Sequence, residues 1–238
     1  MMRQESKTGS WKSRTAAAGL ALLLAVSVAA GKGFARGRTP EDANQGLRLT
    51  VLVCIYVGIP QRDLAWAEHV ASELFQKASV RINWIDCPRT PSSIPNPACH
   101  VPLAKTNLYL NIVPDLDPRL RRSRFVLGFA AVPPPPGRGD TVFISYKRVR
   151  RQLRGAPRLQ MGQLLGKVFA HEIGHLLLGT NSHSPHGLMR AVWAAKQLKN
   201  PGFMQLVFLQ EQVIRIRADV QARMKDQGSQ RTAAVASR

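Results

Sequence analysis

Between residues 47 and 85 the spacing of apolar residues changes twice, from a continuous run to a helical repeat and then to alternation. The run from Leu47 to Val57, LRLTVLVCIYV, is almost continuously apolar and rich in β-branched residues, which predicts a buried strand. After Pro60, apolar residues recur at steps of three and four as far as Ala78, which predicts a helix. Residues 80–85, VRINWI, alternate apolar and polar positions, as a half-buried strand does. This order predicts a right-handed crossover between two parallel strands.

Three further apolar segments extend the predicted sheet, over residues 107–113, 124–132 and 141–149. The run from Pro133 to Pro136 ends the middle segment, because proline cannot donate a hydrogen bond to a neighbouring strand. The expected fold class is therefore α/β (α+β), with a mixed, mostly parallel sheet of about five strands.

Two long helices are expected after the last strand. The first begins near Leu159 and ends at Leu178, where Gly179 provides a C-terminal stop. The second, from about Phe203 to Met224, repeats apolar residues in steps of three and four, which indicates packing on the domain. We expect a single domain in which the sheet packs on both helices.

The N-terminus has the features of a signal peptide. Basic residues precede a fifteen-residue apolar run that ends in small residues at Ala30. The run is shorter than the roughly 20 residues of a membrane span, although an uncleaved signal would still anchor the protein. We expect export to the periplasm or the extracellular space. The predicted organisation is a signal peptide over residues 1–30, a linker over 31–46, a folded domain over 47–226 and a disordered tail over 227–238.

The chain is strongly basic. Its formal net charge is +20, and removal of residues 1–30 leaves +17. Eleven basic residues and a single acidic one lie between Pro118 and Arg158, in two clusters, RLRRSR and KRVRRQLR. Aromatic residues are not interleaved with them and no nucleic-acid motif is present, so a solvated charged rim explains them best. We expect no specific nucleic-acid partner, but non-specific contact with an anionic envelope or membrane surface.

The three cysteines fall into two groups. Cys87 and Cys99 flank a loop rich in proline and serine, where a disulfide would restrict the chain. Two unrelated free thiols are the alternative, because spacing does not establish connectivity. Cys54 lies inside the first predicted strand, which favours a buried thiol.

The stretch HEIGHLLLGTNSHSPHGLM, residues 171–189, carries the candidate chemistry. His171 and His175 are one helical turn apart on the same face, so both imidazoles can reach one Zn²⁺ at about 2.0–2.1 Å. Glu172 points about 100° round the helix and lies beside such an ion. A carboxylate there can accept a proton from water, which makes Glu172 the candidate catalytic base.

This stretch resembles the metzincin superfamily of zinc endopeptidases, and within it the matrix-metalloprotease-like pattern, HExxHxxGxxH followed by a Met-turn. The upstream segment VLGFAAVPPPPGRGDTVFIS is similar to the edge strand, loop and next strand of that family. The spacing departs from the pattern: Gly179 follows His175 by four residues, and Asn181 stands where the third histidine would fall. Met189 nevertheless follows His175 by fourteen residues, as in the family.

The departure leaves two candidates for the third zinc ligand. His183 is favoured because the following Ser184 resembles the family's HS pair. His186 is either the backup ligand or a solvated loop residue. For both His183 and His186, the alternative is an exposed histidine without a role. Met189 is either the apolar floor beneath the zinc histidines or an ordinary core residue.

The resemblance implies a zinc-dependent metalloendopeptidase with Zn²⁺ as its cofactor. The signal peptide adds the expectation of export, and we expect a monomer. The enzyme would hydrolyse a peptide or protein substrate by a zinc-activated water, with Glu172 as general base. Tyr146 and the backbone of residues 126–130 are weaker candidates for stabilising the oxyanion or binding an extended substrate. Two other functions stay open: a catalytically inactive zinc-binding protein, and a basic module that binds envelope polymers.

Overall fold

The computed structural model describes residues 46–90, 94, 96–100, 104–117, 126–135, 137–154, 156, 159–193 and 195–236. The predicted signal peptide and the linker up to residue 45 lie outside the described residues. Within the described ranges, no helix is both long enough and apolar enough to cross a membrane.

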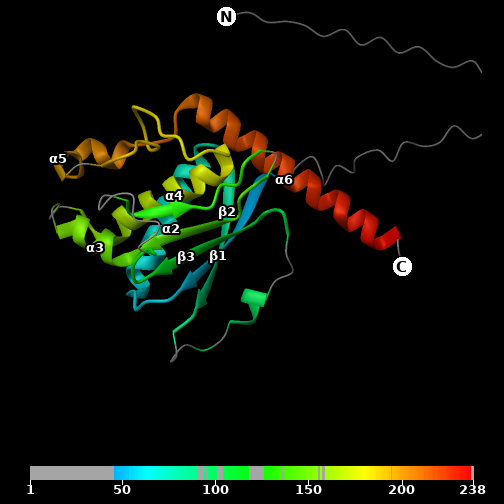
Figure 1. Cartoon of the computed structure of the whole chain (residues 1–238), viewed down its shortest axis with the longest axis horizontal. Coiled ribbons are helices and arrows are strands. Elements are labelled where there is room, and N and C mark those ends of the chain that lie inside the picture. Colours follow the sequence, from blue (N-terminus) through cyan, green and yellow to red (C-terminus); the bar gives the residue numbers. More distant parts are fainter. Residues whose placement is uncertain are drawn as a thin grey trace, which may run out of the picture. The chain divides into compact units, whose positions relative to one another are not determined.

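Five strands form one sheet in the order β2-β1-β3-β5-β4 (Figure 1). Neighbours among the first four pair in parallel, and the edge strand β4 pairs antiparallel with β5. This arrangement confirms the predicted mixed, mostly parallel sheet of a single α/β domain. The strand bounds are Leu47–Ile55 (β1), Val80–Pro88 (β2), Asn107–Val113 (β3), Gly128–Ala130 (β4) and Thr141–Ser145 (β5).

The two faces of the sheet are covered differently. Leu49, Val51 and Val53 of β1 join the main core, which they share with helices α2 (Gln61–Gln76) and α4 (Met161–Leu178). Figure 1 shows these two helices together over that face. Cys54 points to the opposite face, where it packs near a disulfide between Cys87 and Cys99. Cys54 itself is a buried free thiol in register with Cys87.

The strand predicted over residues 141–149 is too long. It ends at Ser145, and helix α3 (Tyr146–Arg154) begins at the next residue. The Ser145 hydroxyl accepts a hydrogen bond from the Arg148 backbone N–H at 3.3 Å, which is the contact a serine N-cap makes. The strand predicted over residues 124–132 is likewise limited, in its described part, to Gly128–Ala130.

The C-terminal helix differs most from the prediction. The helix expected from Phe203 to Met224 is replaced by a short 3₁₀ helix, η3 (Pro201–Gln205), and by α6 (Gln210–Ala236). Residues 227–236, expected to be part of a disordered tail, continue α6. Ion pairs from Arg138 to Asp219 and Asp226 attach this helix to the loop before β5. The other short helices are η1 (Pro97–His100) and α5 (Ala195–Leu198).

Candidate metal centre

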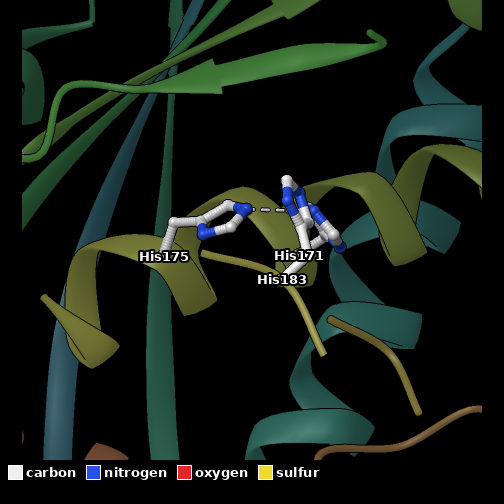
Figure 2. A group of neighbouring side chains, drawn as sticks. All are labelled: His171, His175 and His183. Atoms are coloured by element: carbon white, nitrogen blue, oxygen red, sulfur yellow. Dashed lines mark hydrogen bonds between the residues drawn. The ribbon is translucent and has the colours of Figure 1, made fainter. Parts of the chain in front are cut away.

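Three histidine side chains converge at the C-terminal half of α4. His171 and His175 project from the helix, and His183 approaches from the loop that follows it (Figure 2). One ring nitrogen from each residue lies within 4.8 Å of the other two. The His183 ring stacks on His171 at a centroid distance of 5.4 Å and stands perpendicular to His175 at 4.8 Å. The structure therefore brings together the three histidines that the sequence favoured.

Hydrogen bonds fix which nitrogens of the helical pair are free to bind a cation. His171 Nδ1 lies 2.9 Å from the carbonyl oxygen of Leu188, and His175 Nδ1 lies 2.8 Å from that of Thr180. A carbonyl oxygen only accepts, so each Nδ1 must carry the proton. In neutral rings both Nε2 atoms then present lone pairs, which is the form that binds a metal.

The two Nε2 atoms lie 3.1 Å apart (dashed line in Figure 2). This contact is a hydrogen bond only if one ring is an imidazolium, because both Nδ1 protons are already assigned. Burial opposes that state, lowering the pKa of His171 to about 3 and of His175 to about 4. Two lone pairs facing each other need a cation between them. Two ligands of a tetrahedral zinc ion would be separated by about 3.3 Å, so the helical pair has the spacing of two zinc ligands, and His183 brings a third imidazole within 4.8 Å of them.

The loop after α4 is held in a turn that places His183. The Ser184 backbone N–H donates to the carbonyl of Met189 at 2.9 Å, closing residues 184–189 into a compact loop. The Ser184 hydroxyl donates to the carbonyl of His186 at 2.7 Å and accepts from the Gln212 side chain of α6 at 3.2 Å. His183 immediately precedes this fixed residue. The side chain of His186 is exposed and lies outside the histidine group.

Met189 lies under the turn of α4 that carries the histidines. It is 1% exposed, and its Sδ lies 2.8 Å from where a Cβ of Gly174 would stand. A side chain at residue 174 would therefore displace the methionine. Met189 also belongs to the main core, so it packs beneath the histidine helix as one member of that core.

Glu172 is buried beside the histidines, with 7% of its surface exposed. Burial raises the pKa of its carboxyl to about 8. A divalent cation held by the histidines would lower this pKa, because a nearby positive charge favours the ionised form. The carboxyl lies against Gly128 of β4: a Cβ there would be 2.6 Å from Glu172 Cγ and 2.7 Å from its Oε1. The absence of a side chain at residue 128 leaves room for the carboxyl.

Sequence reasoning missed Trp193, and it included Gly128 only as part of the candidate backbone of residues 126–130, without its close approach to Glu172. A glycine inside a strand pattern often marks a close approach, and this signal was present in VLGFAAV. The Trp193 ring stands edge-on to His171 at a centroid distance of 5.3 Å, although no local pattern connects residues so far apart in the sequence. Tyr146, a weaker candidate, lies on α3 beneath the guanidinium of Arg150 and does not line the cavity.

A cavity of about 410 Å³ opens over the histidines. Its walls are the edge strand, the face of α4 that carries the histidines, and the loop that carries His183. The lining residues are Val126, Leu127, Gly128, Phe129, Ala130, Val168, His171, Glu172, His175, Asn181, His183, Arg190, Ala191 and Trp193.

No family model and no curated protein matches the sequence. Ten chains of solved structures are similar to it. One is an archaemetzincin from Methanopyrus kandleri, 18% identical over 74% of this chain and 98% of that one, with a TM-score of 0.47. Another is metalloproteinase II from Bacteroides fragilis, 11% identical over 73% of this chain and 53% of that one, with a TM-score of 0.41. Because these identities and TM-scores are low, the chemistry of the centre is inferred from the residues of this chain alone.

Proposed function

We propose that the chain is a zinc-dependent peptidase with His171, His175 and His183 as metal ligands. The observation that carries this proposal is the pair of buried, neutral imidazoles whose lone pairs face each other at 3.1 Å beside a third histidine. Three protein nitrogens leave one position of a tetrahedral ion open, as catalytic zinc sites do. A zinc ion bound there supplies a Lewis acid that polarises a carbonyl and lowers the pKa of water to about 7.

Glu172 is the general base in this proposal. Its carboxyl lies in the cavity next to the three histidines, one residue along the helix from His171. No hydrogen bond from the described residues occupies the carboxyl, so it is available to water. As the carboxylate it takes a proton from the attacking water and then passes that proton to the leaving amine nitrogen.

The edge strand β4 binds the substrate backbone. Leu127 and Ala131 hydrogen-bond toward β5, through Ser145 N–H and the Thr141 carbonyl respectively. Because bonding alternates along an antiparallel strand, Gly128 and Ala130 turn their backbone groups away from β5. An extended peptide can pair with these groups as an added strand, which brings one of its carbonyls over the histidines.

Metal analysis and peptide hydrolysis together test the proposal. The purified chain is expected to hold one zinc ion per molecule and to cleave casein until a chelator is added. Glu172→Gln should keep the zinc and lose the cleavage, since an amide cannot accept the proton. His175→Ala should lose both.

The outcomes separate the alternatives. A Glu172→Gln protein that still cleaves would remove Glu172 from the mechanism. Zinc binding without cleavage by the unchanged chain would favour the inactive zinc-binding protein. A chain that binds no zinc but retains anionic polymers would favour the basic binding module.

We further propose that the peptidase is exported, on the basis of the N-terminal sequence pattern. N-terminal sequencing of the mature protein tests this, with a start near Gly31 as the expected result. A mature chain that begins at Met1 or Met2 would contradict it.

A further inference from the structure

The cavity over the histidines carries one side chain that the proposed hydrolysis does not use. Arg190 directly follows Met189, is half-buried and lines the same cavity as Glu172. Among the described residues, no aspartate or glutamate forms an ion pair with it. Apart from Glu172 and the three histidines, the other described residues that line the cavity with Arg190 are uncharged. A guanidinium in such a place lacks the planar anionic partner that it binds best.

Trp193, three residues further on, lines the same cavity. It is 7% exposed, and its Nε1–H has no hydrogen-bond acceptor among the described residues. Buried N–H groups usually have an acceptor, but this nitrogen is shielded from solvent, so a ligand would reach it only after the ring shifted. Arg190 is therefore the donor that this segment offers to a ligand.

Helix α3, which contacts the residues Val126 and Trp193 of the cavity wall, adds positive charge near Arg190. It carries five basic residues and no acidic one. Two of its side chains contact residues that line the cavity: Arg148 Nη1 donates to the Val126 carbonyl at 2.9 Å, and Gln152 Nε2 donates to the Trp193 carbonyl at 2.8 Å. Lys147, Arg150 and Arg154 are exposed on this helix.

The sequence around the site contains almost no negative charge to offset this. Between residues 141 and 210 there are ten basic residues and a single acidic one, Glu172 itself. The resulting field attracts anions to the cavity mouth. A nucleic acid is disfavoured inside it, because Arg190 is the single lysine or arginine among the described residues of the cavity wall, and phosphates would need several.

We infer that the cavity selects peptides with an acidic side chain close to the scissile bond, and that Arg190 determines this specificity. The inference rests on the proposed peptidase function and names its substrate class. Arg190 binds the carboxylate of the substrate side chain, while the edge strand binds the backbone.

Binding to an inactive variant tests this without requiring turnover. The zinc-saturated Glu172→Gln chain is titrated into short fluorescein-labelled Ala/Leu peptides that differ in one central residue: Glu, Gln or Lys. The Glu peptide should bind about tenfold more tightly than the Gln peptide, and the Lys peptide more weakly still. Adding Arg190→Gln should abolish the difference between Glu and Gln, and Arg190→Glu should make the Lys peptide the best ligand.

Arg217→Glu is the matched control. Arg217 is exposed on α6, which does not line the cavity, and the substitution changes the net charge by the same amount. It should leave the order of the three peptides unchanged. Circular dichroism of each variant shows that the fold is retained, and the milder Arg190→Gln serves if Arg190→Glu does not fold.

Several results would overturn the inference. The first two are equal binding of the three peptides and no measurable binding of the Glu peptide. The third is an Arg190→Glu effect no larger than that of Arg217→Glu. The fourth is an oligonucleotide that displaces the labelled peptide as effectively as unlabelled Glu peptide does. Casein cleavage by the unchanged chain reports separately on the proposed function. Cleavage without acidic preference contradicts the inference alone, whereas acidic preference without cleavage contradicts the peptidase alone.

Discussion

At the scale of single residues, the two downstream histidines provide a direct comparison. His183 contacts both helical histidines, while His186 lies on an exposed part of the loop, outside the group. His183→Ala should weaken zinc binding by at least about a hundredfold, because it removes one of three protein ligands. His186→Ala should leave the zinc affinity unchanged and serves as the control. Competition with a chromophoric chelator measures both; equal losses in the two variants would contradict the assignment of His183.

Gly128 is the second residue whose role can be isolated. A methyl group there would meet the Glu172 side chain at 2.6–2.8 Å, so the carboxyl must move. Gly128→Ala should retain zinc but lower kcat/KM on the order of 10²-fold, as expected for a displaced catalytic group. Gly58→Ala is the control, because a Cβ at Gly58 meets nothing within 4 Å. Loss of zinc from Gly128→Ala would instead indicate a general disturbance of the helix.

At the scale of elements, the histidine loop depends on α6. The Ser184 hydroxyl connects the two, since it accepts from Gln212 and donates to the His186 carbonyl. Ser184→Ala should lower zinc affinity about tenfold, because the loop that presents His183 is no longer held in place before the metal binds. Ser184→Thr should restore most of the affinity.

Ser182→Ala provides the comparison for this loop. Ser182 uses its backbone N–H, which donates to Thr180 Oγ1, and its side chain is exposed. Its substitution should leave the zinc affinity unchanged. Isothermal titration of the metal-free proteins measures all three variants, and a Ser184→Ala protein with full affinity would show that the loop is held by other contacts.

How far the sequence predicts these elements depends on the range of the interactions that form them. The histidine helix was predictable to within two residues at its start, and its end at Leu178 was predicted, because its period and Gly179 are local signals. The strand after Thr141 was predicted too long, because the cap at Ser145 competes with an apolar pattern that continues beyond it. Where the extension of α6 begins, Asp226 pairs with Arg138 and Gln227 accepts a hydrogen bond from the Thr106 hydroxyl at 2.6 Å, contacts that no local pattern contains.

At the scale of the whole molecule, the few acidic residues are used in two ways. Several form ion pairs with arginine, such as Asp115 with Arg148 at 2.8 Å and Asp219 with Arg223 at 2.6 Å. Glu68 of α2 and Asp86 of β2 instead lie next to each other, and no lysine or arginine of the described residues pairs with either. In a chain of net charge +20, two neighbouring carboxyl groups without a basic partner are an exception to the general pattern.

The Glu68 carboxyl is buried beside Asp86. Glu68 Oε1 and Asp86 Oδ1 both lie buried without a hydrogen-bond partner among the described residues, an environment that disfavours a charged carboxylate at Glu68. Burial, and then the hydrogen bond and negative charge of Asp86, raise the pKa of Glu68 to about 8. The folded state therefore holds the Glu68 proton more tightly than the unfolded chain, whose glutamates titrate near 4.5. The resulting stabilisation is complete below pH 4.5 and is lost as the pH rises to 8 and above.

Glu68→Gln should remove this pH dependence, because an amide donates to Asp86 at every pH. Between pH 5 and pH 9 the unchanged protein should lose about 1–2 kcal/mol of unfolding free energy that the variant keeps. This figure is reduced for the partial exposure of the pair. Urea unfolding of the zinc-saturated proteins at both pH values measures the difference. Glu73→Gln, on the exposed side of the same helix, should lose as much as the unchanged protein does. Parallel pH profiles for the unchanged protein and Glu68→Gln would mean that the fold does not raise the pKa of Glu68.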